Sequence, residues 1–231
     1  MSRSALVAAV RAALAEQGDP SKAPAMQAYM KSAMPYRGVA SAGQEAILAT
    51  VLAEHPLPDR PTWHDAVLAL WDDAAYREER YAAIALLGHR AYAAYRDPDA
   101  LPLVDHLVVT GAWWDYVDLL ATRTVGPLVR AYPAELVPLM LAWSTDDNLW
   151  RARTAIIHQV GAKAATDRDL LATCIAPSLP SKEFFLRKAI GWGLRDLAWH
   201  DPAWVQAYVR DQAAELSGLS TREALKNCGP G

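Results

Sequence analysis

The sequence has little of what marks a secreted, metal-binding or membrane-spanning protein. Its only two cysteines, Cys174 and Cys228, form no Cys-x-x-Cys pair and no Cys/His cluster. A disulfide framework and a structural zinc site are therefore not expected. No apolar run approaches the ~20 residues that cross a bilayer. The amphipathic N-terminal segment also lacks the features of a secretory signal. We expect a cytoplasmic protein without a membrane partner.

Sequence motifs typical of nucleotide-binding, metal-dependent or hydrolase sites are also missing. There is no GxxxxGK[ST] phosphate loop, no HExxH and no nucleophile elbow, and the six histidines are scattered without ligand spacing. Neither a metal nor a nucleotide cofactor is indicated. The net charge of −3 is unfavourable for a nucleic-acid binder, because phosphate neutralisation favours a basic surface. A binding face needs only local positive charge, so the positions of Arg and Lys determine whether the chain can bind nucleic acid.

Strand signals are nearly absent, whereas helix signals fill the chain. Alternating β-branched runs between Asn-Gly or Asp-Gly turns are missing, and Ala and Leu recur at helical spacing. With 52% hydrophobic and 21% charged residues, the chain is expected to be an all-α globular protein. The predicted helices span residues 3–17, 23–33, 43–54, 62–73, 76–94, 100–110, 114–122, 124–131, 134–143, 148–160, 167–176, 182–199, 202–216 and 220–227.

The connections between these helices are short, which predicts that neighbours in sequence pack antiparallel. Helix pairs recur at about 35–45 residues, near the range of HEAT-type arrays, and nothing resembles an interdomain linker. We therefore predict a single domain over residues 1–231, organised as an α-solenoid.

Capping residues, prolines and glycines predict where several helices begin or end. Asp59 and Asp201 each stand shortly before a proline that suits a first turn, and Asn148 closes a run of capping residues. Gly111 is expected as the left-handed residue after a helix. Ser220 opens a Ser-x-x-Glu capping box before a structural last helix.

The segment AWWDYVD places a carboxylate beside a large indole. Trp114 and Asp118 are four residues apart, so they share one face of a helix. Trp113 is interpreted as a core residue and Asp115 as a helix cap. Asp118 stands within the helix instead, which makes it a candidate functional carboxylate.

The segment LWRARTAII carries Arg151 and Arg153, which cannot point the same way on a helix. We expect one to lie along the surface and the other to reach an inner face. A guanidinium suits phosphate because it donates two parallel hydrogen bonds. For either arginine alone, a solvated surface is the more common role.

A third segment, KEFFLRKAIGWGLR, places Lys188, Trp192 and Arg195 in one helical stripe. A basic, aromatic stripe is typical of a surface that meets a phosphate backbone. Salt-bridged surface charge around a half-buried tryptophan is the alternative. Nearer the N-terminus, Tyr29 and Lys31 belong to another group of aromatic and basic residues at a helix end.

Taken together, these segments resemble the AlkD family of DNA alkylation repair glycosylases, which are built from HEAT-like repeats. The matching stretches are QAYMKSAMPYRGV, WWDYVD, LWRARTAI, FFLRKAIGWGLRDLA and STREALKN, in an order that runs from Gln27 to Asn227. The combination is specific, although each stretch alone is weak. The resemblance implies a right-handed α-solenoid of HEAT-like antiparallel helix pairs, C-shaped, with a concave DNA-binding face.

The resemblance also implies roles for individual residues. The family's active-site Trp-x-x-x-Asp falls on Trp114 and Asp118, and its second aromatic residue falls on Trp192. Its phosphate-binding arginine falls on Arg153, and the tyrosine of the YMK segment falls on Tyr29. Further candidates for contacts to the DNA backbone are Lys31, Arg187, Lys188 and Arg195.

The function implied is a DNA N-glycosylase that excises N3- and N7-alkylated purines from duplex DNA, without a cofactor and as a monomer. An alkylated purine is cationic and already a good leaving group. Asp118 is expected to stabilise the positive charge that develops on the deoxyribose and to position water, and Trp114 and Trp192 to present π faces to that charge. The resemblance further implies that the base stays stacked instead of entering a pocket.

Two other interpretations remain open. The first is a non-catalytic HEAT-like scaffold that binds protein or damaged DNA, which an acidic or apolar concave face would favour. The second is a structure-specific DNA binder that has lost hydrolysis. Asp118 argues against a pure binder, because a carboxylate facing phosphates contributes nothing to binding.

Overall fold

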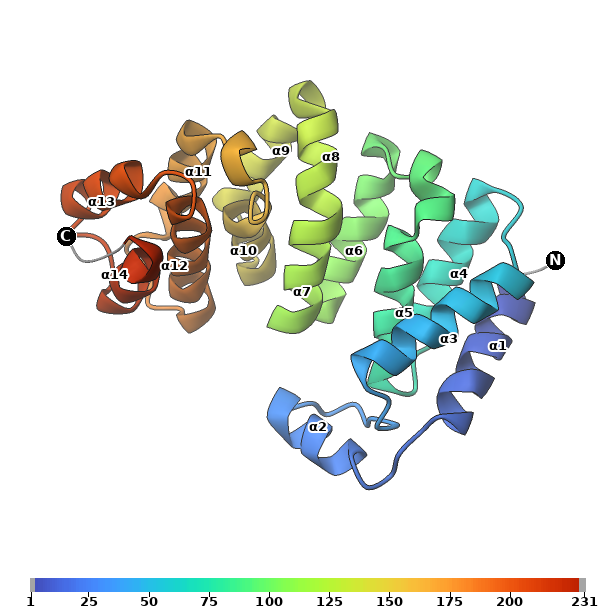
Figure 1. The fold of residues 1–231 in the computed structure, drawn as a ribbon. Helices are drawn as coiled ribbons and strands as arrows, with labels where there is room; N and C mark the ends of the chain where they lie inside the picture. Colours follow the sequence, from blue (N-terminus) through green and yellow to red (C-terminus); the bar gives the residue numbers. More distant parts are fainter. Residues whose placement is uncertain (1–2, 229–231) are drawn as a thin grey trace. The chain divides into compact units, whose positions relative to one another are not determined.

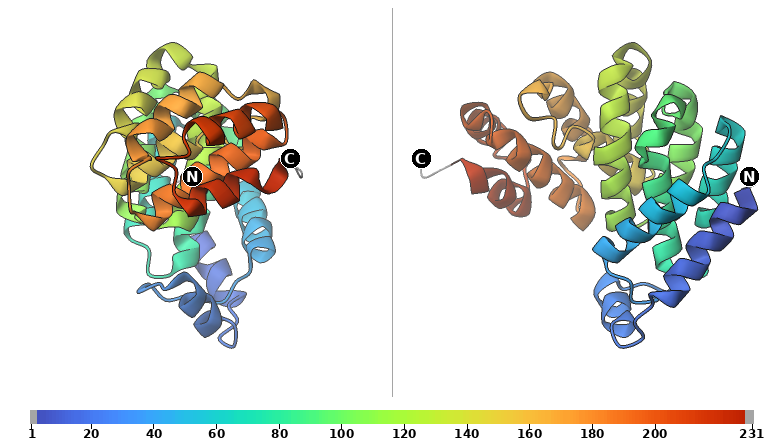
Figure 2. Two further views of the ribbon diagram at one scale, coloured as in Figure 1. Left: turned by 90° about the vertical axis from the view of Figure 1, so that its left-hand side faces the viewer. Right: turned by 45° about the vertical axis from the view of Figure 1, so that its right-hand side comes forward.

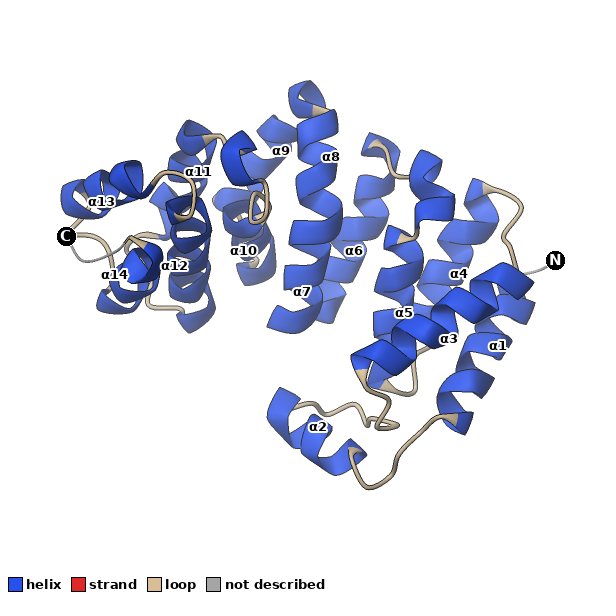
Figure 3. Ribbon diagram, viewed as in Figure 1, coloured by secondary structure: helices blue, strands red, loops and turns tan. Residues whose placement is uncertain are grey.

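The computed structural model describes residues 3–228, and within them it is 75% helical and has no strand (Figure 3). This confirms the predicted all-α class. None of the helices in this range combines the length and the apolar character needed to span a membrane. The α-helices, labelled in Figure 1, are α1 (Arg3–Glu16), α2 (Ala23–Met30), α3 (Ser41–Glu54), α4 (Arg60–Asp72), α5 (Arg77–Gly88), α6 (Leu101–Gly111), α7 (Trp114–Leu120), α8 (Gly126–Ala131), α9 (Pro133–Ser144), α10 (Leu149–Ile157), α11 (Arg168–Ile175), α12 (Phe184–Ala198), α13 (Pro202–Asp211) and α14 (Gly218–Ala224).

Three helices begin at the capping residues that the sequence predicts. The side chain of Asp59 accepts a hydrogen bond from the backbone N–H of Thr62 at 2.8 Å. The Asn148 side chain accepts from two N–H groups in the first turn of α10, and Asp201 accepts from Trp204 at 3.0 Å. Each cap satisfies donors that have no partner within the helix. These predictions are confirmed.

Two other predicted boundaries are wrong. Gly111 is the last residue of α6, and Ala112 takes the left-handed conformation, with φ of 45°. The last helix is capped by Ser217, which accepts from the N–H of Ser220 at 3.0 Å. Ser220 is therefore buried inside α14, and Glu223 binds cations instead of closing a capping box.

The break predicted near residue 123 is absent, because one continuous helical path runs from α7 into α8 through a π-helical turn at Ala121–Val125. The N–H of Gly126 donates to the carbonyl of Ala121, five residues back. Pro127 follows directly, and a proline lacks an N–H and clashes with the carbonyl four residues earlier. The wider turn accommodates this proline without ending the helix.

The described residues form two compact units, one up to Tyr95 and one from Arg96. In the first unit, α1 packs against α3, α4 and α5, and α4 packs against α5. Its core includes the fully buried side chains of Leu6, Val10 and Leu70. Helix α2, by contrast, has no buried residue.

In the second unit, successive helices stack in an ordered series, which is the predicted α-solenoid architecture. Helices α7, α10, α12 and α14 form a row in which each packs against the next, and α9 packs against α11 in a second layer (Figures 1 and 2). The core between them includes Ile156, Leu171, Ile190 and Leu194. The row α7–α10–α12–α14 carries most of the predicted site residues.

Candidate active site

The predicted carboxylate Asp118 and the predicted phosphate-binding Arg153 form an ion pair between α7 and α10. Nε of Arg153 donates to Oδ1 of Asp118 at 2.7 Å, and Nη2 donates to Oδ2 at 2.9 Å. The arginine side chain is 5% exposed and the aspartate side chain 16% exposed. Because the pair is bidentate, the carboxylate and the guanidinium are fixed in a common orientation. The sequence predicted both residues but not this bond.

Arg153 makes a third hydrogen bond, from Nη1 to the backbone carbonyl oxygen of Phe185 at 2.6 Å. A guanidinium has five N–H donors, so the three bonds leave two donors, one each on Nη1 and Nη2. A guanidinium binds a phosphate through N–H donors of this kind. The donor count thus allows Arg153 to hold Asp118 and an anion together.

Two opposing effects act on the ionisation of Asp118. Burial raises the pKa of this carboxyl above its ordinary value, and the charge of Asp115 acts in the same direction. The hydrogen bonds and positive charge of Arg153 oppose the rise. Arg153 is therefore the group that favours the ionised form of a largely buried carboxylate.

Arg151, two residues before Arg153 on α10, is held on a more exposed side of the helix. Its Nε and Nη2 donate to the carboxylate of Asp105 at 2.8 and 2.7 Å, and its Nη1 donates to Asp146 at 3.1 Å. The Arg151 side chain is 30% exposed. The expected divergence of the two arginines is confirmed.

The two tryptophans predicted to face the substrate are both half-buried in the second unit. Trp114 is the first residue of α7, four residues before Asp118. Trp192 lies on α12 and packs against the hydrophobic core of this unit. A half-buried indole keeps part of its π face available for contact.

Trp113, interpreted as a core residue, is half-buried among other aromatic rings at the start of α7. It also occupies the N-cap position of that helix, where no side chain provides a cap. The interpretation of Asp115 as the cap is wrong, because Asp115 is buried within the first turn of α7.

The predicted stripe on α12 is ion-paired. Lys188 donates to one carboxylate oxygen of Glu223 on α14 at 3.1 Å, and Arg195 donates to the other at 2.6 Å. Lys226 also reaches Glu223, at 2.8 Å. Hydrogen bonds from Lys226 and Lys188 lower the pKa of Glu223 to about 2. Salt-bridged charge, the alternative left open by the sequence, therefore describes these cations, although three positive charges surround one negative charge.

Arg187, another candidate for a DNA contact, is used within the protein. Its Nε donates to the carbonyl oxygen of Ser181 at 2.9 Å, and its own carbonyl accepts from the hydroxyl of Ser220 at 2.9 Å. These bonds tie the start of α12 to the preceding loop and to α14. A backbone-contact role for Arg187 stays a prediction.

Tyr29 and Lys31 belong to the first unit. The Tyr29 side chain is 75% exposed, and Lys31 ends α2 in the left-handed conformation, with φ of 49°. The loop that follows is held by the buried carboxylate of Glu78, which accepts hydrogen bonds from the backbone N–H groups of Arg37, Gly38 and Val39. This loop includes Gly38, whose φ of 87° disfavours a side chain.

Comparison with known proteins decides the family. A family model described as "DNA alkylation repair enzyme" matches residues 10–228. The chain belongs to the DNA alkylation repair enzyme family. A solved structure described as a predicted DNA alkylation repair enzyme from Enterococcus faecalis is 28% identical in sequence, with a TM-score of 0.82. The match covers 93% of this chain and 98% of that chain. No curated protein matches the sequence.

Besides the bond between Asp118 and Arg153, two further contacts at the site of this DNA alkylation repair enzyme were not predicted. The first is the hydrogen bond from Arg153 to the Phe185 carbonyl. The second is the set of ion pairs that the Glu223 carboxylate forms with three cations. A backbone acceptor has no signature in a sequence. The sequence assigns Glu223 to a capping box because of its spacing from Ser220. Its role as a partner of the α12 cations follows only from the packing of α12 against α14.

Proposed function

We propose that this protein is a DNA N-glycosylase that excises N3- and N7-alkylated purines from duplex DNA in base excision repair. The observation that carries the proposal is the Asp118 carboxylate, largely buried and held on both oxygens by Arg153. A fixed carboxylate in a site of low exposure stabilises positive charge that develops beside it. The family supports a DNA repair role for the chain.

The chemistry needs no cofactor. An N3- or N7-alkylated purine carries a positive charge, so the bond from its nitrogen to C1′ of the deoxyribose breaks with the electron pair going to the base. The base leaves neutral, and the sugar becomes an oxocarbenium-like cation. Asp118 stabilises this cation and orients a water molecule, which adds to C1′ and releases a proton to solvent. The products are a free base and an abasic site.

Other residues then act in binding. The two remaining donors of Arg153 hold a phosphate, which sets the register of the duplex. Trp114 and Trp192 present π faces to the cationic sugar and lesion, each contact contributing about 0.5–2 kcal/mol. Lys188, Arg195 and Arg187 contact the backbone from the second unit. Tyr29 and Lys31, both exposed at the end of α2, contact it from the first.

We further propose that the protein acts as a monomer on a base that remains stacked. Selectivity then comes from the lability of the cationic lesion, and no base pocket limits the size of the adduct. Bulky N7 adducts are expected to be released as well as methyl adducts. Release confined to methylated bases would indicate a pocket that receives a flipped base.

The function is tested by incubating the protein with a duplex that contains one 7-methylguanine and measuring free base by chromatography. The proposal predicts release above the spontaneous rate, with one abasic site formed for each base released. Repair that restores guanine in the strand would indicate removal of the alkyl group instead. Tight binding without release would favour the non-catalytic scaffold.

A further inference from the structure

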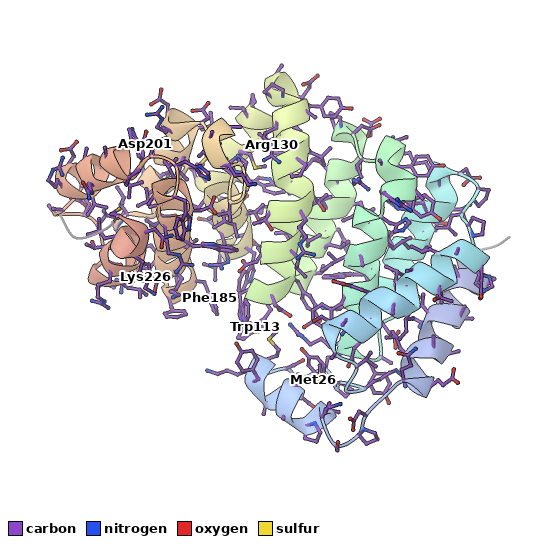
Figure 4. All side chains as sticks on the ribbon, viewed as in Figure 1. Met26, Trp113, Arg130, Phe185, Asp201 and Lys226 are labelled. Carbon is purple, nitrogen blue, oxygen red and sulfur yellow. The ribbon has the colours of Figure 1, made fainter. Side chains whose placement is uncertain are left out.

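Three aromatic rings form a cluster where α7, α10 and α12 begin. The ring centroids of Phe185 and Trp150 are 5.1 Å apart, those of Phe185 and Trp113 are 5.5 Å apart, and the two indoles are 6.4 Å apart. Figure 4 shows Trp113 and Phe185 next to each other at the ends of their helices. Edge and tilted contacts at these distances are favourable geometries for aromatic pairs.

Each ring stands close in sequence to a group of the ion pair. Trp113 immediately precedes α7, which carries Asp118. Trp150 is the second residue of α10, three residues before Arg153. Phe185 is the second residue of α12, and its own carbonyl oxygen accepts the third bond of Arg153. The cluster thus joins the three helix starts that determine the positions of Asp118, Arg153 and the Phe185 carbonyl.

The relative position of these helix starts matters because the pair depends on three short hydrogen bonds of 2.6 to 2.9 Å. Arginine has a long side chain with many rotamers, and its orientation is defined only when several acceptors hold the guanidinium plane. Loss of the carbonyl contact leaves Nη1 without its acceptor in a side chain that is 5% exposed. The guanidinium then turns toward other acceptors or water, and Asp118 loses its fixed orientation.

We propose that Phe185 is a positioning residue for base release: its ring, packed against Trp113 and Trp150, holds the start of α12 so that its carbonyl fixes Arg153 on Asp118. This inference rests on the proposed glycosylase function. Phe185 touches no substrate in this scheme. It acts through Arg153, which in turn sets the orientation of the charge-stabilising carboxylate.

The neighbouring phenylalanine provides a matched control. Phe184 precedes Phe185 on α12 and is 57% exposed, and its ring meets the Phe185 ring edge-on, with centroids 5.4 Å apart. Phe184→Ala removes the same number of atoms from the same helical turn. It removes the edge contact with Phe185 but none of the contacts that join Phe185 to the two indoles.

The test compares Phe185→Ala and Phe184→Ala in base release and in the ¹H–¹⁵N spectrum of the arginine side chains. For Phe185→Ala we expect kcat to fall about 10- to 100-fold, the range that a misplacement of about 1 Å causes, while KM for lesion DNA changes less than about twofold. The Arg153 Nε–H signal, assigned with Arg153→Lys, moves toward the position of a free arginine. Phe184→Ala leaves kcat and this signal unchanged.

Equal kcat values and an unchanged Arg153 signal in a folded Phe185→Ala variant would overturn the proposal. If that variant does not fold, Phe185→Leu keeps most of the buried volume and is measured in the same way. If the wild-type protein releases no base, the glycosylase function fails. The Arg153 signal then still decides whether Phe185 positions the ion pair.

Discussion

At the scale of single residues, Arg151 and Arg153 show how burial separates two identical side chains on one helix. Both bind an aspartate with two hydrogen bonds. The pair of Arg151 with Asp105 is about 30% exposed on both sides, whereas Arg153 is 5% exposed. Exposed ion pairs are weak because solvent screens them, so solvent screens the charges of the Arg153 pair less than those of the Arg151 pair.

The ionisation of Asp118 leads to a prediction about pH. In the proposed mechanism, base release requires the ionised carboxylate, and burial raises the pKa of Asp118 above its ordinary value. Release should therefore fall on acidification, in a pH range above that of an ordinary aspartate, about 3.9. Arg153→Gln removes the positive charge that opposes the rise, so it should move this acid limb to higher pH.

The measurement is kcat against pH for the wild type and Arg153→Gln, corrected for spontaneous depurination. An acid limb at or below the ordinary range of aspartate, or one that Arg153→Gln moves to lower pH, would contradict this account of the site.

Much at this scale follows from helical periodicity and could be predicted. The shared face of Trp114 and Asp118 and the divergence of Arg151 and Arg153 depend only on spacing within a helix. The bond between Asp118 and Arg153 could not be predicted, because it joins two helices 35 residues apart in sequence. The Phe185 carbonyl was not predictable either, because it belongs to the backbone.

At the scale of helices and turns, the π turn at Ala121–Val125 is the least expected element. It lies directly after α7 and lets the helix continue past Pro127. The same stretch packs closely on the C-terminal end of α10, where a Cβ at Gly126 would overlap the carbonyl oxygen of His158. A side chain at residue 126 is therefore excluded by the backbone of the neighbouring helix.

Gly126→Ala should consequently lower the free energy of unfolding by about 2 kcal/mol or more, in the range of overpacked buried sites. The control is Gly88→Ala at the end of α5, where an added Cβ meets nothing within 4 Å. That substitution should be neutral, or stabilising by up to about 1 kcal/mol. Chemical denaturation of both variants checks the prediction, and a similar effect of the two substitutions would contradict it.

Helix starts were easier to predict than helix ends or internal turns. Asp59, Asn148 and Asp201 cap through side chains that are visible in the sequence. The left-handed residue after α6 is Ala112 instead of the adjacent Gly111, so the preference of glycine for this conformation did not locate the end of the helix. A π turn changes the 3.6-residue periodicity of hydrophobic positions very little. The proline after it, Pro127, suggests a helix break that the structure does not have.

At the scale of the whole molecule, the all-α class and the stacking of helices in the second unit were predicted from short connections and helical spacing. The family model extends on both sides of the boundary at Tyr95 between the two compact units. The single domain over residues 1–231 stays a prediction. The net charge of −3 describes the whole chain and says nothing of local charge. On α12 and α14, three cations surround the single carboxylate of Glu223.

Global stability should depend on His158, which is fully buried at the end of α10. Burial lowers its pKa to about 4, whereas the unfolded chain takes up a proton near 6.5. The unfolded state thus binds more protons between these values, so stability is complete above pH 6.5 and falls as the pH drops toward 4. The loss from His158 at pH 4.5 is about 2.5 kcal/mol.

Denaturation at pH 7 and pH 4.5 tests this for the wild type and His158→Gln, whose side chain does not titrate. The wild type should lose about 2.5 kcal/mol more than the variant over this interval. The same loss in both proteins would show that His158 does not carry the effect.

The most direct test of the central claim compares Asp118→Asn with Asp105→Asn in release of 7-methylguanine from a duplex. Both substitutions remove one carboxylate charge that is paired with an arginine of α10. Asp118→Asn should lower the rate by about 100-fold or more, with lesion DNA still bound, and Asp105→Asn should stay within about twofold of the wild type. Wild-type release by Asp118→Asn, or equal losses in both folded variants, would contradict the assignment of Asp118 as the charge-stabilising carboxylate.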